Sequence, residues 1–263
     1  MSEHRYAFGD NDPAAERLAM VADVFAQPSR ALLGELSGLR FRVAIDLGCG
    51  PGHSSQLLAD QAAPEQLVGI DLSENYLERA RARGLSQARW HRHDVTDLPL
   101  PQAPADLIYA RLVLAHLSER ATVLAGWLSQ LCPEGCLVLE EDEEILAETE
   151  VLADYELMAK TLISDRGGDL YVGRLLAEMV PPPYQVALSR TYNHAVPDPI
   201  AARLFAMNFR VWRTDPLVLA RYSSSALDGL ARGLDALAAS RARGTVDFVI
   251  RQLIVRAPAE GLL

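Results

Sequence analysis

The chain has 263 residues and a formal net charge of −10 at pH 7, with 49% hydrophobic and 23% charged residues. This balance is typical of a folded globular protein and excludes an intrinsically disordered chain. No Lys/Arg-rich run interrupts the acidic excess, which disfavours rRNA, tRNA and DNA as partners because a polyanion requires a concentrated positive surface. Arginine supplies nearly all the positive charge and Lys160 is the only lysine, a bias common in GC-rich bacterial genomes.

No apolar run reaches the roughly 18 residues of a membrane span, and residues 1–13 carry no apolar signal core. The cysteines, Cys49, Cys132 and Cys136, are odd in number and fit a reducing compartment. We therefore expect a cytoplasmic protein without a membrane partner. Cys132 and Cys136 resemble half of a metal site, but no second ligand pair follows, so no metal is expected.

Residues 43–52 form the most informative stretch and read VAIDLGCGPG. The apolar run at residues 41–47 predicts a strand buried on both faces. Gly48, Gly50 and Gly52 follow at alternate positions, where the missing Cβ permits positive φ and lets a ligand approach the main chain. The next segment has helical character, so its first amides would face the loop. Strand, glycine loop and helix predict a nucleotide-binding α/β unit.

The spacing of these glycines distinguishes two classes of cofactor. Dinucleotide sites use G-x-G-x-x-G, in which the helix amides hold a pyrophosphate. Here the pattern is G-x-G-x-G, with Asp46 two residues before Gly48. A carboxylate at that mouth would repel a pyrophosphate but suits a cationic ammonium or sulfonium group. The spacing therefore disfavours a nicotinamide oxidoreductase.

Further segments continue the alternation of strands and helices. A second apolar run, at residues 67–73, contains Asp71, about 20 residues beyond the glycine loop, where an acid can accept both ribose hydroxyls. Residues 88–95 predict a third strand, and residues 105–117 predict a strand that runs into a helix. Residues 131–141 predict a turn and a fifth strand.

Together these segments resemble the class I S-adenosylmethionine (SAM)-dependent methyltransferases, in the type 11/25-like branch that acts on small molecules. The resemblance covers residues 1–145 well and the remainder loosely. It implies a Rossmann-like, doubly wound α/β fold with a seven-stranded, mostly parallel sheet of order 3-2-1-4-5-7-6 and an antiparallel last strand. It also implies SAM as the cofactor and S-adenosylhomocysteine (SAH) as the product. The residues expected to contact the cofactor are Tyr6, Asp46, Gly48, Gly50, Gly52, Asp71, Leu72, Asp94, Val95 and Arg111.

The resemblance assigns roles to several of these residues. Asp94 is expected to accept the adenine amino group while Val95 covers the ring; alternatively, Asp94 forms an Asx turn with Thr96. Tyr6 lies in RYAFG, which is similar to an N-terminal Tyr-x-Leu-Gly element that closes over the cofactor. Phe8 replaces the usual leucine of that element.

Methyl transfer from a sulfonium needs an in-line approach, and a base only where the acceptor must lose a proton. His116 follows the fourth strand and is the catalytic candidate, with an ordinary pKa near 6.5; the alternative is a histidine that packs a helix. Arg111 could anchor a carboxylate of the substrate or the cofactor, or pair with Glu140 or Glu141. These two acids and Asp142 end the fifth strand and could face the acceptor, or form a solvated surface.

The resemblance divides the chain into three regions. Residues 1–40 would form N-terminal helices and a lid, and residues 41–144 the SAM-binding core. Residues 145–263 would complete the sheet and add helical insertions, at about 145–170 and 198–243, which cap the substrate site.

Local patterns place the elements outside the core. Residues 13–37 predict two helices interrupted at Pro28, and residues 145–164 predict one long helix. Residues 184–196 alternate like a sixth strand, and residues 245–256 predict the last.

We therefore expect an enzyme that methylates a small molecule, with specialised metabolites among the candidate acceptors, at oxygen, nitrogen or an electron-rich carbon. The alternative is a SAM-binding protein that uses the cofactor structurally or as a sensor. The sequence does not indicate the oligomeric state. The aromatic residues of the predicted cap are expected to form the core between helices rather than a substrate cage: Phe205, Phe209, Trp212 and Tyr222.

Overall fold

The computed structural model describes residues 12–259. The strands are β1 (Val43–Leu47), β2 (Gln66–Asp71), β3 (Ala88–Arg92), β4 (Ala105–Arg111), β5 (Leu131–Ala147), β6 (Gln185–Pro197) and β7 (Thr245–Arg256). They form one sheet of order β3-β2-β1-β4-β5-β7-β6. The first five strands are parallel, and β7 runs antiparallel to both β5 and β6. The predicted sheet order and the antiparallel last strand are confirmed.

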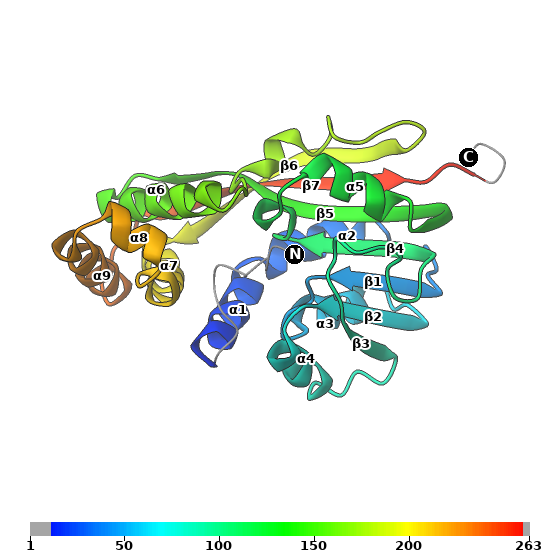
Figure 1. Cartoon of the computed structure of the whole chain (residues 1–263), viewed down its shortest axis with the longest axis horizontal. Coiled ribbons are helices and arrows are strands. Elements are labelled where there is room, and N and C mark those ends of the chain that lie inside the picture. The colour runs from blue at the N-terminus through cyan, green and yellow to red at the C-terminus, as the bar shows by residue number, and fades with distance from the viewer. Residues whose placement is uncertain (1–11, 260–263) are drawn as a thin grey trace.

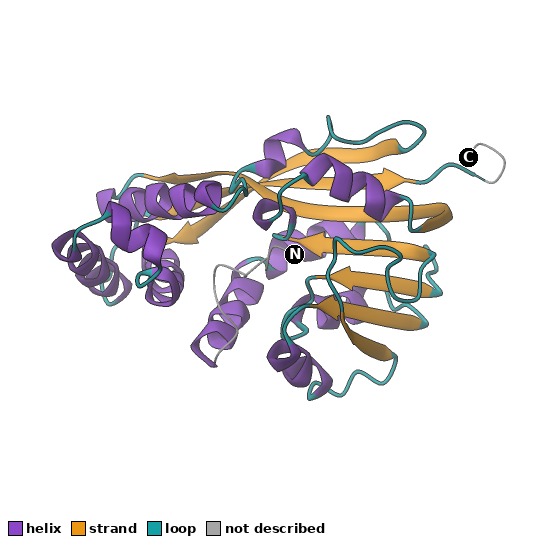
Figure 2. Ribbon diagram, viewed as in Figure 1, coloured by secondary structure: helices purple, strands orange, loops and turns teal. Residues whose placement is uncertain are grey.

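Helices cover the sheet and extend beyond one end of it (Figures 1 and 2). They are α1 (Asp12–Val24), α2 (Ala26–Gly34), α3 (His53–Gln61), α4 (Glu74–Arg81), α5 (Arg120–Leu128), α6 (Glu150–Asp165), α7 (Asp198–Trp212), α8 (Pro216–Arg221) and α9 (Ser224–Ala238), with the 3-10 helices η1 (Leu114–His116) and η2 (Val172–Leu175). In Figure 1, α6–α9 lie together beyond the carboxyl ends of β1–β4, with α1 between them and the core. We call α6–α9 the cap.

The core lies on both faces of the sheet because alternate side chains of each strand point to opposite sides. On β4, Leu107 and Tyr109 pack in the cluster that includes residues of α2 and α3, whereas Ile108 and Ala110 pack in the cluster that includes α5. All four residues are fully buried. This is the pattern of a parallel strand covered by helices on both sides.

The two N-terminal helices form as expected, but the break between them lies at Phe25 rather than at Pro28. Pro28 occupies the first turn of α2, where a backbone N–H has no intrahelical partner and a proline is tolerated. A proline cannot continue a preceding helix, so α1 ends at Val24, just upstream.

The predicted long helix at residues 145–164 was placed too early. β5 continues to Ala147, past a bulge between Asp142 and Glu144, and α6 begins only at Glu150. The 12-residue β7 explains the difference, because its first residues pair with the end of β5, from Val246 opposite Ala147 onwards. Pairing over this length overrides the local helical preference of the segment.

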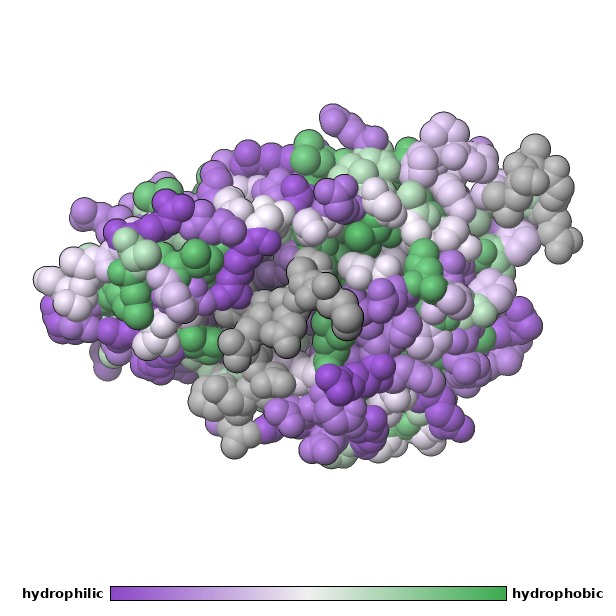
Figure 3. Space-filling view, in the orientation of Figure 1, coloured by the Kyte–Doolittle hydropathy of each residue, from purple (hydrophilic) through white to green (hydrophobic). Residues whose placement is uncertain are grey.

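The cap has its own aromatic core, which includes Phe209 and Trp212 as expected; Phe205 packs there too but also lines the cavity described below. Phe205, Phe209 and Trp212 are 2%, 1% and 1% exposed. Phe205 stacks on Tyr155 of α6 with ring centroids 4.1 Å apart. Tyr222 is only partly buried against this cluster. Figure 3 shows a largely hydrophilic face with small hydrophobic areas, some of them over the cap.

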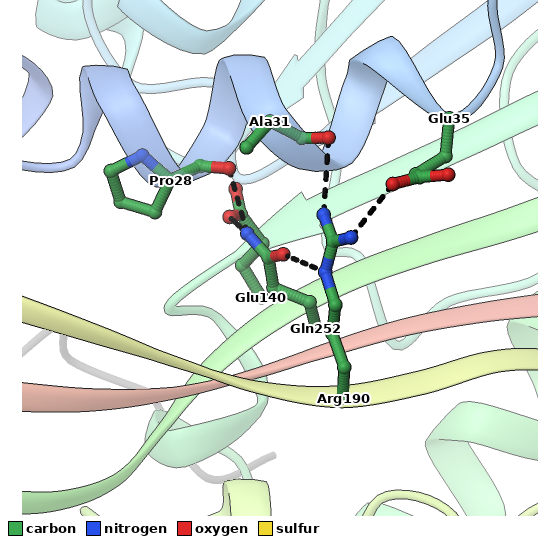
Figure 4. A network of polar contacts seen from close by, with 6 residues as sticks. All are labelled: Pro28, Ala31, Glu35, Glu140, Arg190 and Gln252. Atoms are coloured by element: carbon green, nitrogen blue, oxygen red, sulfur yellow. Dashed lines mark hydrogen bonds and ion pairs between the residues drawn. The ribbon is translucent and has the colours of Figure 1, made fainter.

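A polar network fastens α2 to the far strands of the sheet (Figure 4). Gln252 of β7 donates to the Pro28 carbonyl oxygen at 2.7 Å and to Glu140 Oε1 at 2.9 Å. Arg190 of β6 donates to Gln252 Oε1 at 2.8 Å and to Glu35 Oε1 at 2.7 Å. The network joins three strands to one helix and fixes how α2 crosses the sheet. We call it the α2 clamp.

Candidate active site

The glycine loop between β1 and α3 takes a conformation that requires glycine. Gly48, Gly50 and Gly52 have φ values of +65°, +51° and +80°. A Cβ on Gly48 would lie 2.8 Å from Val113 Cγ2, closer than side-chain atoms approach one another. Gly48 and Gly50 line a cavity, so the absent side chains leave main chain open to a ligand.

This cavity lies between the glycine loop and the cap and has a volume of about 570 Å³. Its walls come from α1, the ends of β2, β4 and β5, η1, α6, α7 and β7, so segments distant in sequence meet there. One end is formed by the glycine loop with Asp71 and Val95, and the other by Tyr155, Phe205 and Phe248. The position at the carboxyl ends of the strands is where open α/β sheets bind ligands.

Asp71 ends β2 at the glycine-loop end of the cavity. Its Oδ2 accepts from Gly50 N at 2.9 Å and its Oδ1 accepts from Ser73 N at 2.8 Å. A carboxylate oxygen has two lone pairs and can accept more than one hydrogen bond. Leu72, the next residue, also lines the cavity and is 45% exposed.

Asp46 lies behind the loop rather than in the cavity wall. Its Oδ2 accepts from the hydroxyls of Ser54 and Ser55 at 2.7 and 2.5 Å, which holds the start of α3 against β1. Its Oδ1 is buried and has no hydrogen-bond partner in the described chain. Burial raises the pKa of Asp46 to about 6, against the lowering effect of the two serine hydroxyls and of Arg111.

Asp94 forms the Asx turn that was its alternative. Its Oδ1 accepts from Thr96 N at 2.9 Å and from Thr96 Oγ1 at 2.7 Å. Val95, its neighbour, lines the cavity, and the Val95 carbonyl oxygen accepts from Trp127 Nε1 at 2.7 Å. The structure therefore places Val95 in the cavity wall and Asp94 outside the wall. Tyr6 lies outside the described residues.

Arg111 ends β4 and brings a cation into the cavity wall. It donates to Ser29 Oγ at 3.1 Å and forms no ion pair with a carboxylate in the part of the chain that the structure describes. Pairing with Glu140 or Glu141 is therefore not its role. His53 lines the cavity nearby and accepts from Arg83 through Nδ1. Burial, with Arg83 and Arg111, lowers the pKa of His53 to about 4.

His116 ends η1 and also lines the cavity. Burial, together with the neighbouring charges of Arg17 and Arg166, lowers its pKa to about 4. The expectation that His116 has an ordinary pKa near 6.5 is therefore wrong. The imidazole is neutral at pH 7 and can accept a hydrogen bond there, but it is a weak base.

The cap end of the cavity has few polar groups, and several are bonded to one another. Arg17 of α1 donates to Asn208 Oδ1 at 3.1 Å, and Asn208 Nδ2 donates to the Tyr155 hydroxyl at 2.8 Å. Tyr171 donates to Glu156 in a short hydrogen bond. The rest of this end is apolar, with Ile145, Ala159, Ile163, Leu170, Leu204, Phe205 and Phe248.

The acids at residues 140–143, which lie within β5 because the strand continues to Ala147, are not a solvated surface. Glu140 and Glu141 are 0% exposed, Asp142 is 5% and Glu143 is 8%. Glu141 accepts from the backbone N–H groups of Val113 and Leu114 at 2.8 and 2.7 Å, which holds the start of η1. Burial raises the pKa of Glu141 to about 8 despite these bonds. Asp142 belongs to the cavity wall.

Residues 12–259 contain no group of three or more His, Cys, Asp or Glu side chains that could hold a metal ion. Within the same range, no helix combines the length and apolar character needed to cross a membrane.

Sequence comparison assigns the chain to a family. A family model described as a methyltransferase domain matches residues 44–135. The trans-aconitate 2-methyltransferase of Methylobacterium radiotolerans is 32% identical over 189 residues, which is 68% of this chain and 72% of that protein. The chain belongs to the class I SAM-dependent methyltransferases. A second trans-aconitate 2-methyltransferase, from Sinorhizobium fredii, is 35% identical, but the alignment spans only about half of each protein: 50% of this methyltransferase and 51% of the relative.

Solved structures share the fold of this methyltransferase at low identity. A phosphoethanolamine N-methyltransferase of Haemonchus contortus, in complex with phosphomonomethylethanolamine and SAH, has a TM-score of 0.55 at 16% identity, covering 92% of this chain and 57% of that one. A cyclopropane synthase of Mycobacterium tuberculosis has a TM-score of 0.55 at 17% identity, covering 90% and 83% of the two chains.

The cofactor of this methyltransferase is SAM, and the glycine-loop end of the cavity fits it. The absent Cβ atoms at Gly48 and Gly50 open the main chain, Asp71 offers carboxylate oxygens, and Arg111 offers a guanidinium without an ion-pair partner among the described residues. Bound SAM supplies an electrophilic methyl group carried on a sulfonium.

The sequence did not single out several residues of the cap end. Arg17, Tyr155, Asn208 and Phe248 come from α1, α6, α7 and β7, and no local motif links them. Only the topology, which folds the cap back over the carboxyl ends of the strands, brings them together. No signal in the sequence alone could have identified this set.

Proposed function

We propose that this methyltransferase transfers the SAM methyl group to a small-molecule acceptor held under the cap. The observation that carries the proposal is a single cavity of about 570 Å³, lined by Gly48 and Asp71 at one end and by Tyr155, Phe205 and Phe248 at the other. This volume lies within the ~300–1,000 Å³ typical of small-ligand pockets. Because the two ends belong to one cavity, a donor and an acceptor can meet inside it.

For the donor, we assign the ribose hydroxyls to Asp71 and the adenine face to Leu72 and Val95. The methionine carboxylate is assigned to Arg111 and its main-chain contacts to Gly48. These assignments rest on the position of each residue in the cavity wall and on its chemistry. Asp46 and Gly52 support the loop from behind, and Asp94 holds the turn that presents Val95.

For the acceptor, we propose a molecule with a largely apolar body. The trans-aconitate 2-methyltransferases are named for a tricarboxylic acid. Binding three carboxylates would require several free cations, but the arginines of this cavity are Arg17, which is bonded to Asn208, and Arg111 at the donor end. The apolar walls instead support an acceptor that buries hydrocarbon or aromatic surface, a property shared by many specialised metabolites.

Methylation at oxygen, nitrogen or an electron-rich carbon is compatible with this proposal. We place the reaction in the cytoplasm, since the three cysteines of the chain are free, and we propose no nucleic-acid partner, since the chain carries a net charge of −10.

The test is SAH formation from SAM, measured by mass spectrometry with a panel of apolar amines, phenols and carboxylic acids. We expect acceptor-dependent SAH release by the wild-type protein. Asp71→Asn is expected to weaken SAH binding by about tenfold or more, whereas Asp60→Asn, on the exposed side of α3, should bind SAH like the wild type. Tight SAH binding without product from any acceptor would favour the alternative, a SAM-binding protein that does not transfer the methyl group.

A further inference from the structure

Five consecutive acids lie within β5 at residues 140–144, and three of the four buried ones accept hydrogen bonds from the protein. Glu140 accepts from Tyr109 at 2.7 Å and from Gln252 at 2.9 Å. Glu141 accepts from two backbone N–H groups at the start of η1 through Oε1, while its Oε2 is buried without a partner. Glu143 forms an ion pair with Arg251 and accepts from Thr191 Oγ1 at 2.9 Å. Each of these carboxyls has a structural explanation.

Asp142 has none. No described residue donates a hydrogen bond to its carboxyl or forms an ion pair with it, and its Oδ1 is completely buried without a partner. The residue is only 5% exposed, and it lies in the wall of the cavity that also contains Gly48 and Asp71. The carboxyl therefore lies at the wall of the space under the cap.

A buried carboxyl without partners is costly, because neither water nor the protein compensates its lost hydration. An apolar residue or an asparagine would pack at this position at lower cost. Groups held unsatisfied at the wall of a cavity are candidates for contact with a ligand.

We propose that Asp142 binds an amino group of the acceptor, so that this methyltransferase takes an amine with an apolar body. This inference rests on the proposed function, since it places the amine in the cavity assigned to the acceptor. It goes further by naming the charged group of the acceptor and the residue that recognises it.

The charges around Asp142 favour an amine over a carboxylate. Burial raises the pKa of Asp142 well above its ordinary value, and the negative charges of Glu141 and Glu140 raise it further. The titratable groups on the elements around it are Glu140, Glu141, Glu143 and Glu144 on β5, Arg251 on β7 (paired with Glu143), Arg174 on η2 (paired with Glu144), Tyr171 and Glu156 (bonded to each other), His116 (neutral at pH 7) and Arg17 on α1 (bonded to Asn208). None of these described cations forms an ion pair with Asp142. A ligand cation would supply the missing charge, whereas a ligand carboxylate would add to the acidic excess.

Binding of an ammonium has a proton balance that can be measured. In the free protein, burial and the neighbouring acids raise the pKa of the Asp142 carboxyl, which favours its protonated form. When an ammonium group binds, the carboxyl ionises to form the ion pair, and a proton that it carried passes to the buffer. An alcohol or a carboxylate that occupies the same space causes no such release.

The test uses three probes that share an aromatic body: 2-phenylethylamine, 2-phenylethanol and 3-phenylpropanoate. Each is titrated calorimetrically at pH 7 into the full-length protein saturated with SAH, in two buffers of different ionisation enthalpy. We expect the amine to bind most tightly and to release protons to the buffer as it binds. In Asp142→Asn, which keeps the shape of the side chain, we expect amine affinity to fall roughly 10- to 100-fold and proton release to disappear.

Glu144→Gln is the matched control, because Glu144 lies on the same strand but outside the cavity wall, paired with Arg174 at 3.3 Å. It should bind the amine and release the proton like the wild type. Unchanged amine binding in Asp142→Asn, with SAH affinity intact, would overturn the inference and leave the proposed function standing. Preferential binding of the carboxylate or the alcohol would overturn it in the same way. If none of the probes binds to the SAH-loaded protein at millimolar concentration, the small-molecule proposal itself is contradicted.

Discussion

At Gly48 the backbone has a φ of +65°, and any side chain would meet Val113. Gly84 has a similar φ of +72° but has no atom within 4 Å of the position of a Cβ, and it does not line the cavity. The two glycines therefore share one conformational constraint and differ in what surrounds them. This pair separates the effect of backbone strain from that of crowding at the loop.

We expect Gly48→Ala and Gly84→Ala each to lower the free energy of unfolding by about 1–2 kcal/mol, the cost of a left-handed conformation for a residue with a Cβ. Gly48→Ala should also weaken SAH binding by about tenfold or more, because the loop must shift to relieve the contact with Val113. Gly84→Ala should bind SAH normally. Denaturant unfolding and calorimetry measure both quantities, and equal SAH affinities would show that the Gly48 loop does not contact the cofactor.

His116 provides a prediction of pH dependence. Its pKa of about 4 lies below the ordinary 6.5, so the histidine contributes stability that is present above pH 6.5 and is lost as the pH falls towards 4. Between pH 7 and pH 5 the wild type should therefore lose about 1–2 kcal/mol more of its free energy of unfolding than His116→Asn does. Urea unfolding at the two pH values checks this. Equal losses would mean that His116 has an ordinary pKa.

The catalytic role of His116 stays a prediction, and its lowered pKa decides how that role can be tested. A histidine that is neutral throughout pH 6–9 gives no inflection in turnover near pH 6.5. A flat profile therefore does not remove His116 from the reaction. The informative comparison is His116→Ala, which we expect to reduce turnover far more than SAM affinity.

Among single residues, the sequence identified those that belong to a local motif and missed those that do not. The glycine loop, Asp71 and Val95 follow strands at recognisable spacing, and the structure places them in the cavity wall. Asp142 was weighed only as part of an acidic run, because from sequence alone five acids in a row cannot be distinguished from a solvated surface. Their burial depends on β7 pairing with β5, a contact between residues more than 100 positions apart.

At the scale of elements, the α2 clamp connects the N-terminal helices to the site. Gln252 is completely buried and joins the Pro28 carbonyl, Glu140 and Arg190. The same helix presents Ser29, whose hydroxyl accepts from Arg111 in the cavity wall. The position of α2 therefore influences a residue assigned to the donor.

We expect Gln252→Ala to lower the free energy of unfolding by about 2–4 kcal/mol, because it leaves the buried Glu140 and Arg190 with unsatisfied groups. Gln185→Ala, at the exposed start of β6, is the control and should change stability by less than about 0.5 kcal/mol. Denaturant unfolding with comparison of m-values measures the difference. Similar effects of the two substitutions would mean that the clamp contributes nothing to the fold.

Element prediction succeeded where local pattern and tertiary pairing agree. The last strand was placed at residues 245–256, which matches Thr245–Arg256. It failed at residues 145–147, where the local sequence favours a helix but β7 requires a partner strand. Information about that partner is absent from the segment itself.

At the scale of the whole molecule, the sheet supplies the donor site and the cap supplies the acceptor space. Long strands β5, β6 and β7 extend beyond the core and carry the cap helices with them (Figure 1). This arrangement makes one cavity from segments at both ends of the chain. The division into three regions, and the use of the cap as a substrate roof, remain predictions that a ligand complex would test.

The most direct measurement is a crystal structure of the protein with SAH. We predict that the ribose hydroxyls contact Asp71 and that the homocysteine part follows Gly48, so that the sulfur faces the space shared with Asp142 and Phe248. SAH bound outside this cavity, or no SAH at the glycine loop in crystals soaked at millimolar concentration, would contradict the account.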